Sequence, residues 1–251
     1  MNALRLALGT LTVFPTKPPT VVDRRVAGLA MALAPLVSLV LVVPLWLLSL
    51  RVEHHWSPLL TAVMWVGGLA FLTRAMHLDG LSDTADGLGS GKPAGEALAI
   101  MRKSDVGPFG VATLVLVLLA QVAAATQLIV EPDGVALVAV AVVWSRLVLP
   151  AACLVGTPAA REEGLGAMVA GSVSWPKLLG SYGVAQLGVV GILLVSHVDW
   201  ERALTAAIAV IVGRLFCTWC VRRLGGITGD VLGACVEVTF TVALLGMCLY
   251  N

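Results

Sequence analysis

The chain has 251 residues, of which 59% are hydrophobic and only 12% are charged, and its formal net charge is +1. An ordinary soluble domain carries about 25% charged residues. A chain with so few charges and a mean hydropathy of +0.96 cannot keep its surface in water. The low net charge also argues against nucleic acid as a partner, because binding to it requires a strongly basic face. The composition therefore predicts an integral membrane protein that lies in a lipid bilayer.

Seven apolar segments, taken in chain order, are long enough to cross a membrane, which needs about 20 mostly apolar residues. Pro35 and Pro44 interrupt the first segment, so we expect it to be kinked or divided into two shorter helices. The sequence predicts an all-α fold, a polytopic helical bundle with about seven transmembrane helices in a single membrane-embedded catalytic domain, residues 1–251. The predicted spans are residues 26–50, 56–76, 111–130, 135–155, 178–197, 203–221 and 231–250.

Basic residues gather in alternate connections between these spans. The other connections hold only Arg51 and Arg202, together with several acids, among them Glu53 and Asp199. By the positive-inside rule, the basic connections and the N-terminus are cytoplasmic, in the cell (inner) membrane. We expect the active-site loops there, because the long connections 77–110, 156–177 and 222–234 belong to this side. The basic group comprises Arg5, Lys17, Arg24, Arg25, Arg74, Lys92, Arg102, Lys103, Arg161, Lys177, Arg222 and Arg223.

Two cysteines have the spacing of a metal or redox pair. Cys217 and Cys220 lie in an apolar run of helical length, and no second pair lies near them in the sequence. We therefore expect buried thiols without a metal.

The most informative stretch is HLDGLSDTADGL, which begins at His77. Asp79, Asp83 and Asp86 are spaced i, i+4 and i+7, which places them within an arc of about 60° on a helix. Their mutual repulsion would destabilise the helix unless a divalent cation binds there, and Mg²⁺ prefers carboxylate, water and phosphate oxygens. We therefore predict a Mg²⁺ site, with the glycines after Asp79 and Asp86 leaving room for a phosphate. The alternative is a solvated acidic helix end, and His77 is either a ligand or acid, or an interfacial histidine with no catalytic role.

Two further polar stretches belong to cytoplasmic connections. Arg102 and Lys103 precede a glycine-bounded turn, SDVGPFG, which is typical of a phosphate clamp; the alternative is a basic anchor at the membrane surface. The glycine-rich stretch GGITGDVLGA contains Thr228 and Asp230, which could bind a metal ion or a hydroxyl group. Its alternative is a turn that begins a helix with a small-residue packing surface.

Three ionisable residues lie inside predicted spans, where each needs a partner or an aqueous cavity. They are Arg146, Arg214 and Glu237. Arg214 and Glu237 both lie about 10 Å from the predicted cytoplasmic boundary, at the helical rise per residue. We expect them to line a cytoplasmic cavity as a pair, with Arg214 within reach of a substrate phosphate; the alternative is an ion pair with a purely structural role.

These motifs resemble the signature of the cobalamin synthase family, the adenosylcobinamide-GDP ribazoletransferases. The matching stretches are HLDGLSDTADG, IMRKSDVGPFG and GITGDVLGA, with a weaker match in LTVFPT near the start. Their order and spacing match the family across essentially the whole chain. One departure is Lys103, because family members often carry an acid directly after the arginine that matches Arg102.

The resemblance implies a reaction that joins adenosylcobinamide-GDP to α-ribazole, or to its 5′-phosphate, and releases GMP. This is the last assembly step of cobalamin synthesis, with Mg²⁺ as the cofactor and a site that faces the cytoplasm. The three motif aspartates would hold Mg²⁺, and Arg102, Lys103 and Thr228 would bind phosphate oxygens. Asp230 or Asp83 would accept the proton of the attacking ribose hydroxyl.

Two other classes remain as alternatives. A CDP-alcohol phosphotransferase also uses clustered aspartates, but its motif follows the first Asp-Gly with Ala-Arg, whereas Leu81 and Ser82 follow here. A transporter is disfavoured because no inverted repeat with paired broken helices is evident. The sequence neither indicates nor excludes a homo-oligomer.

Overall fold

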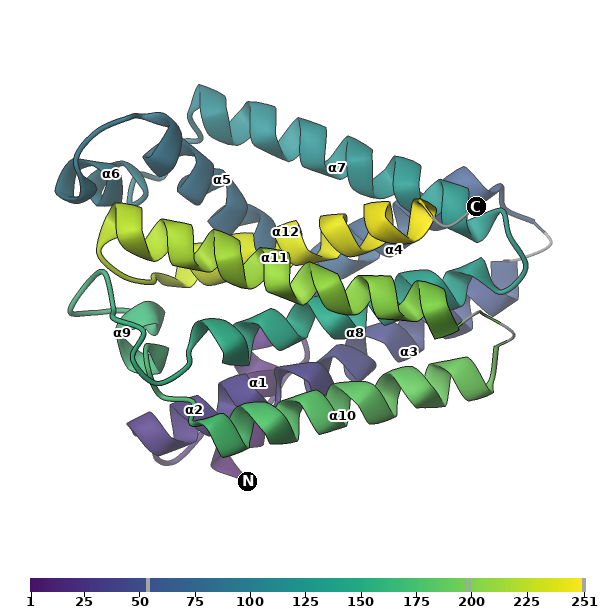
Figure 1. Cartoon of the computed structure of the whole chain (residues 1–251), viewed down its shortest axis with the longest axis horizontal. Helices are drawn as coiled ribbons and strands as arrows, with labels where there is room; N and C mark the ends of the chain where they lie inside the picture. The colour runs from purple at the N-terminus through teal and green to yellow at the C-terminus, as the bar shows by residue number, and fades with distance from the viewer. Residues whose placement is uncertain (53–54, 197, 199, 250–251) are drawn as a thin grey trace.

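The protein is an all-helical bundle, described by a computed structural model for residues 1–52, 55–196, 198 and 200–249 (Figure 1). Within these residues there is no β-strand, only two isolated bridges between loops. The all-α prediction is therefore confirmed. The helices of the described chain are α1 (Asn2–Leu11), α2 (Arg24–Ala32), α3 (Ala34–Val52), α4 (Pro58–Leu72), α5 (Met76–Gly89), α6 (Ala94–Ile100), α7 (Pro108–Ile129), α8 (Gly134–Ala152), α9 (Leu165–Val169), α10 (Trp175–Leu194), α11 (Trp200–Leu224) and α12 (Gly229–Cys248).

The membrane-spanning helices are close to the predicted segments. In the described chain, six helices are long and apolar enough to cross a membrane, namely α3, α7, α8, α10, α11 and α12. They lie roughly along one another in Figure 1. The bent pair α4 and α5 can supply a seventh span, so the prediction of a polytopic bundle with about seven spans is confirmed. The predicted ends at residues 197 and 250 lie outside the described residues.

Two predicted spans differ from the helices observed. The first is divided, because α2 ends before Leu33 and α3 begins at Ala34, one residue before Pro35. This agrees with the expectation of two pieces, since proline cannot continue a helix without loss of a hydrogen bond. The second is only 15 residues long as α4, which is about 22 Å at the helical rise and short for a membrane.

A sharp bend of 87° separates α4 from α5. Arg74 and Ala75 adopt left-handed conformations there, with φ of 56° and 53°, so the helix stops and restarts in a new direction. The Arg74 side chain secures the bend, because Nη2 donates a hydrogen bond to the carbonyl oxygen of Gly9 at 2.7 Å. The bend directs the acidic helix α5 away from the axis of α4.

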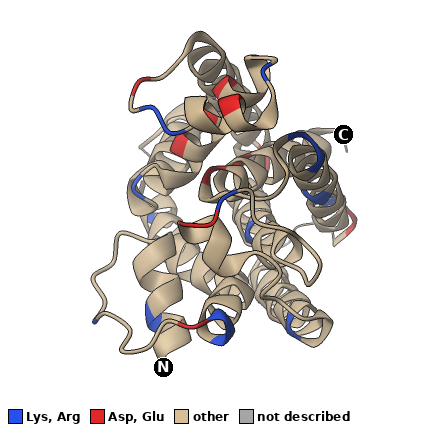
Figure 2. Ribbon diagram, turned by 90° about the vertical axis from the view of Figure 1, so that its left-hand side faces the viewer, with Lys and Arg blue, Asp and Glu red and all other residues tan. Residues whose placement is uncertain are grey.

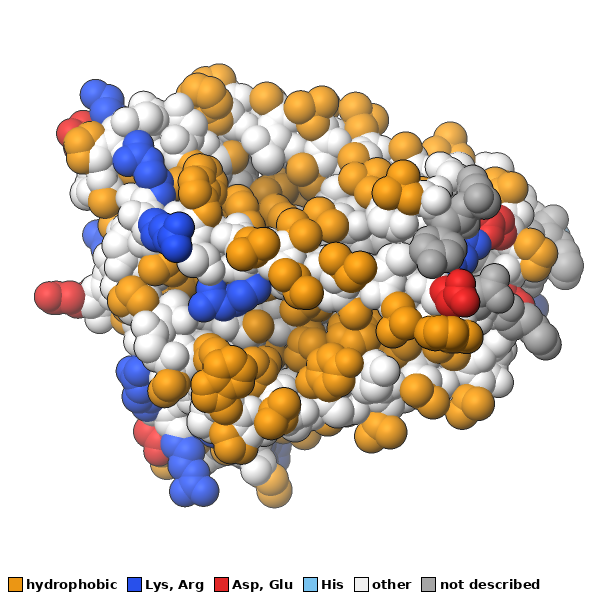
Figure 3. All heavy atoms as spheres, viewed as in Figure 1, with side chains coloured by type: hydrophobic (Ala, Val, Ile, Leu, Met, Phe, Trp, Pro, Cys, Tyr) orange, Lys and Arg blue, Asp and Glu red, His pale blue; other side chains and the backbone are white. Residues whose placement is uncertain are grey.

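The centre of the bundle is α8. In its apolar stretch 89% of the residues are buried, against 22% in both α7 and α10, so α7 and α10 lie on the outside of the bundle. Figure 3 shows apolar side chains over the middle of one face, with basic side chains at one end. Cys217 and Cys220 are buried free thiols, as predicted.

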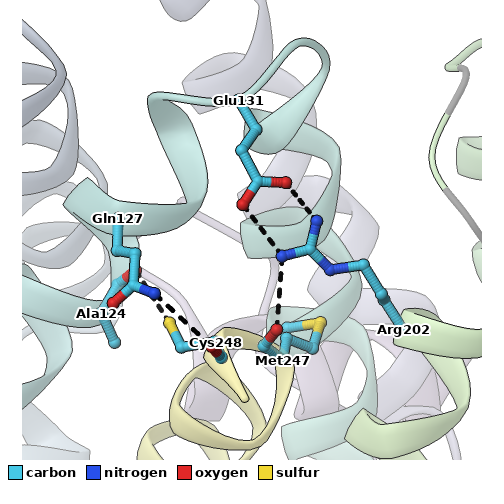
Figure 4. Close-up of polar contacts among 6 residues, drawn as sticks. All are labelled: Ala124, Gln127, Glu131, Arg202, Met247 and Cys248. Atoms are coloured by element: carbon cyan, nitrogen blue, oxygen red, sulfur yellow. Dashed lines mark hydrogen bonds and ion pairs between the residues drawn. The ribbon is translucent and has the colours of Figure 1, made fainter. Parts of the chain in front are cut away.

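At the end opposite α5 and α6, an ion pair joins the connection between α7 and α8 to the start of α11 (Figure 4). Arg202 donates two hydrogen bonds to the carboxylate of Glu131, one of them from Nη2 to Oε1 at 3.0 Å. The same Nη2 approaches the carbonyl oxygen of Met247 at 3.4 Å. The connection is a tight turn, because the amide of Gly134 donates to the carbonyl oxygen of Glu131 at 3.0 Å.

This pair predicts a pH dependence of stability. The hydrogen bond from Arg202 lowers the pKa of Glu131 below its ordinary value of 4.5. The pair therefore stabilises the folded state at pH values above 4.5, and its contribution is lost as the pH falls through the lowered pKa. We expect Glu131→Gln to lower the melting temperature in detergent by about 1–3 °C at pH 7, with a difference from the wild type that shrinks as the pH falls through the lowered pKa of Glu131. Glu201→Gln, a change of another acid at this end, is the control; an equal loss there would contradict the assignment.

Candidate active site

The candidate site is built where α5 crosses α12 in direct backbone contact. A Cβ atom on Gly80 of α5 would lie 2.6 Å from the carbonyl oxygen of Asp230, and one on Gly233 of α12 would lie 3.1 Å from the Cα of His77. Glycine at both positions is therefore what permits the close approach. The expectation that the glycines of the motif leave room for a phosphate is wrong, because Gly80 packs on α12 and Gly87 packs on Met101.

The crossing brings three carboxylates together, Asp79, Asp83 and Asp230, which we call the acidic cluster. Asp79 is exposed, while Asp83 and Asp230 are half-buried. The charges of Asp79, Asp230 and, more weakly, Asp86 act on Asp83, and that of Asp79 also acts on Asp230. Such an arrangement of like charges is stabilised by a cation. Figure 2 looks onto this end of the molecule, where acidic and basic segments lie among one another.

The third motif aspartate, Asp86, points away from this cluster and into the start of α7. Its Oδ2 accepts a hydrogen bond from the amide of Gly107 at 2.7 Å, and its Oδ1 accepts one from the amide of Gly110 at 2.9 Å. A Cβ atom on either glycine would lie 2.4 Å from a carboxylate oxygen. Asp86 thus places a negative charge at a helix N-terminus, which is favourable, and holds α5 to α7. A metal contact by Asp86 stays a prediction.

Loss of this contact has a measurable consequence. Asp86→Asn replaces one charged acceptor oxygen by an amide group that cannot accept, so one buried amide loses its partner. We expect a loss of about 1–3 kcal/mol in the free energy of unfolding, measured by thermal unfolding in detergent. Asp105→Asn, an exposed acid in the same connection, is the control. A melting temperature equal to that of the wild type in Asp86→Asn would contradict this role.

A residue that the motifs did not reveal, Arg161, reaches the acidic cluster from the connection between α8 and α9. This connection is docked on the turn before α12, because the amide of Ile227 donates to the carbonyl oxygen of Pro158 at 2.9 Å and that of Ala160 donates to Ile227 at 3.0 Å. Arg161 Nη1 then lies 3.5 Å from Oδ2 of Asp230. The sequence indicates Arg161 only as one of the basic residues in the connections, since no motif surrounds it.

The guanidinium of Arg161 is held on two sides. Nη2 donates to the carbonyl oxygen of Leu98 in α6 at 2.9 Å, opposite the contact with Asp230. Burial lowers the pKa of Arg161 and the nearby Asp230 raises it. Arg102 is exposed and lines a cavity of about 630 Å³ together with Arg161, so the predicted phosphate-binding arginine does lie beside the site. Lys103 is exposed after α6 and is not among the residues that line this cavity.

Thr228 caps the helix that carries Asp230. Its Oγ1 accepts a hydrogen bond from the amide of Val231 at 3.1 Å and donates one to Oδ2 of Asp230 at 3.2 Å. These are the contacts of an N-cap residue. The hydroxyl therefore orients Asp230, and its predicted contact with phosphate stays a prediction.

Three other predicted residues make no hydrogen bond or ion pair with the acidic cluster in the described part of the chain. His77 is buried at the crossing of α5 and α12. Arg214 donates from Nη1 to Oγ1 of Thr218 on its own helix at 2.6 Å, and Glu237 accepts from Nε2 of Gln121 at 2.8 Å. The predicted pairing of Arg214 with Glu237 is wrong, because no ion pair between these two described residues exists and Glu237 faces α7 instead.

The predicted Mg²⁺ site depends on which oxygen atoms the acidic cluster can offer to a metal ion. In the part of the chain that the structure describes, no three His, Cys, Asp or Glu side chains converge on one metal position. Mg²⁺, however, is commonly held by one or two carboxylates together with water and substrate phosphates. The hard oxygen donors of the acidic cluster fit a Mg²⁺ ion whose coordination the substrate completes.

Comparisons with known proteins agree along the whole chain. The family model described as cobalamin-5-phosphate synthase matches residues 3–248. A protein of Frankia casuarinae named adenosylcobinamide-GDP ribazoletransferase is 40% identical, over 99% of this chain and 95% of its own length. A protein of Nocardioides sp. with the same name is 41% identical, over 97% of both chains. No solved structure matches.

Proposed function

Because the chain belongs to the cobalamin-5-phosphate synthase family over residues 3–248, we propose that its transfer reaction is Mg²⁺-dependent and takes place at the acidic cluster. The activity is that of an adenosylcobinamide-GDP ribazoletransferase, the final assembly step of cobalamin synthesis. The family match over nearly the full length displaces the CDP-alcohol phosphotransferase and transporter alternatives. The substrates are the GDP-activated corrinoid and α-ribazole or its 5′-phosphate.

The observation that carries the proposal is the crossing of α5 and α12, which brings the charges of Asp79, Asp83 and Asp230 near one another, with Arg161 in contact with Asp230. Arg102 lines the cavity beside this cluster. In the reaction, a hydroxyl oxygen of the ribazole forms a new bond to the corrinoid-side phosphorus, and the bond from that phosphorus to GMP breaks. Arg161 and Arg102 bind the phosphate oxygens of the departing GMP. When Mg²⁺ is bound by the acidic cluster, it supplies charge neutralisation for the pyrophosphate.

Asp83 is the residue that we assign as the proton acceptor. Oδ2 of Asp230 is engaged by Arg161 and Thr228, whereas Asp83 has no hydrogen-bond or ion-pair partner among the described residues. A free, half-buried carboxylate can accept the proton of the attacking hydroxyl as its oxygen bonds to phosphorus. Asp230, which Arg161 and Thr228 orient, contributes negative charge to the acidic cluster.

The location of the site relative to the membrane follows from the charges. The acidic cluster lies at the end of the bundle where the basic connections gather, which by the positive-inside rule supports a site on the cytoplasmic side of a cell membrane. Sealed membrane vesicles of the two orientations test this. We expect inside-out vesicles to form adenosylcobalamin and GMP from added substrates and right-side-out vesicles to form none. Product in right-side-out vesicles alone would reverse the orientation.

A further inference from the structure

A cavity of about 630 Å³ opens beside the acidic cluster, between α6 and the connection that carries Arg161. Its volume is in the range of small-molecule sites. Leu98 and Ala99 of α6 contribute an apolar wall, and charged side chains of both signs complete the lining. Such a lining can contact a ligand that has an apolar face together with anionic groups and hydrogen-bond donors.

One end of this cavity suits phosphate. Arg161 belongs to both the cavity and the acidic cluster, because its guanidinium contacts Asp230 and its side chain lines the cavity. Arg102 lies close enough for its charge to act on Arg161. A phosphate bound by these two arginines would therefore stand next to the carboxylates where the transfer takes place.

The remaining charged groups are of the opposite sign. Glu162 and Glu163 directly follow Arg161 and both line the cavity. Both are exposed, and neither has a hydrogen-bond or ion-pair partner in the part of the chain that the structure describes. A carboxylate only accepts hydrogen bonds, so these two groups select a ligand edge that carries N–H donors.

Guanine has such an edge, because N1–H and the N2 amino group are adjacent donors that one carboxylate can accept together. Adenine presents an unprotonated N1 at the corresponding position, which a carboxylate repels. A site that is built for a hydrogen-bonding group rejects an analogue that lacks it far more strongly than an apolar pocket does. The two glutamates thus favour guanine over adenine.

We propose that this cavity binds the GMP part of the activated corrinoid, with Glu162 and Glu163 recognising guanine and Arg102 and Arg161 binding the phosphate. The inference rests on the proposed function and names its nucleotide specificity. It predicts that GMP, the leaving group, binds the free protein at this place, and that AMP does so much more weakly.

Equilibrium binding of GMP and AMP to the detergent-purified full chain tests the proposal without the need for turnover. We expect the wild type to bind GMP at least about 10-fold more tightly than AMP. In the variant Glu162→Gln with Glu163→Gln, each side chain keeps its shape but presents an amide donor, so we expect the ratio to fall to near one. Glu96→Gln, in the neighbouring α6 and paired with Lys92 on the surface, should keep the ratio of the wild type.

The outcomes are separable from those of the proposed function. Equal affinities of the wild type for GMP and AMP, or an unchanged ratio in the double variant, would overturn the inference even if the protein performs the transfer. A preserved preference for GMP that depends on the two glutamates would support it. Absence of transfer in a protein that binds GMP in this way would count against the proposed reaction alone.

Discussion

Replacement of Asp83 by asparagine is expected to reduce kcat for the transfer by about 100- to 10,000-fold, the range for loss of a general base. The change keeps the shape of the side chain but removes its charge and its capacity to accept a proton. Asp83 is also the carboxylate on which the charges of both Asp79 and Asp230 act, so the substitution weakens binding of a cation at the same time. The measurement is GMP release under saturating substrates.

The fold should survive this change. Asp83 has no described hydrogen-bond partner, and removal of one of three like charges relieves repulsion, so we expect a melting temperature equal to or above that of the wild type. Glu96→Gln is the matched control, because Glu96 is an exposed acid at the same end of the molecule. Near-normal turnover in Asp83→Asn would show that the acidic cluster is not the reaction centre.

Alanine in place of Gly80 is expected to have a comparably large effect through the backbone. Its Cβ would lie 2.6 Å from the carbonyl oxygen and 2.9 Å from the Cα of Asp230, and main-chain atoms cannot move aside as a flexible side chain can. We expect α5 and α12 to separate slightly, with a loss of about 1–3 kcal/mol in stability. Because the acidic cluster is formed at this crossing, transfer activity should fall at least about 100-fold, the scale on which misplacement of reacting groups by about 1 Å acts.

Gly67→Ala is the control for Gly80→Ala. Gly67 is also a helical glycine, in α4, but a Cβ there meets no atom within 4 Å. Since alanine is the better helix former by about 1 kcal/mol, this variant should keep its activity and its melting temperature, or gain in stability. If both variants behave like the wild type, the close contact between α5 and α12 does not determine the site.

Much of the fold could be predicted because a run of about 20 apolar residues indicates a helix that can cross a membrane. The six long spans, the divided first segment and the helical setting of Asp79 and Asp83 all follow from local patterns. The bend after α4 could not be predicted, because it depends on left-handed conformations of Arg74 and Ala75, and neither is a glycine, the residue that normally indicates such a conformation. Hydropathy therefore predicts the helices but not the crossing of α5 and α12.

The candidate site could be predicted only in part, because local sequence patterns do not specify contacts between distant segments. Helical spacing placed Asp86 with Asp79 and Asp83, but the start of α7 covers Asp86 and uses both of its oxygens. Arg161 is brought to the site by a loop-to-loop contact between segments almost 70 residues apart. Depth in the membrane suggested that Arg214 and Glu237 pair, but depth does not specify which way a side chain turns around its helix axis, and Glu237 turns toward Gln121.

The most direct test of the account is GMP release by the detergent-purified protein from adenosylcobinamide-GDP and α-ribazole, with Mg²⁺ present and with Mg²⁺ removed by a chelator. We predict GMP in equal amount to newly formed adenosylcobalamin, formed only with Mg²⁺ and lost in Asp83→Asn. Stoichiometric release that continues without any divalent cation, or at an unchanged rate in Asp83→Asn, would contradict a Mg²⁺-dependent transfer at the acidic cluster.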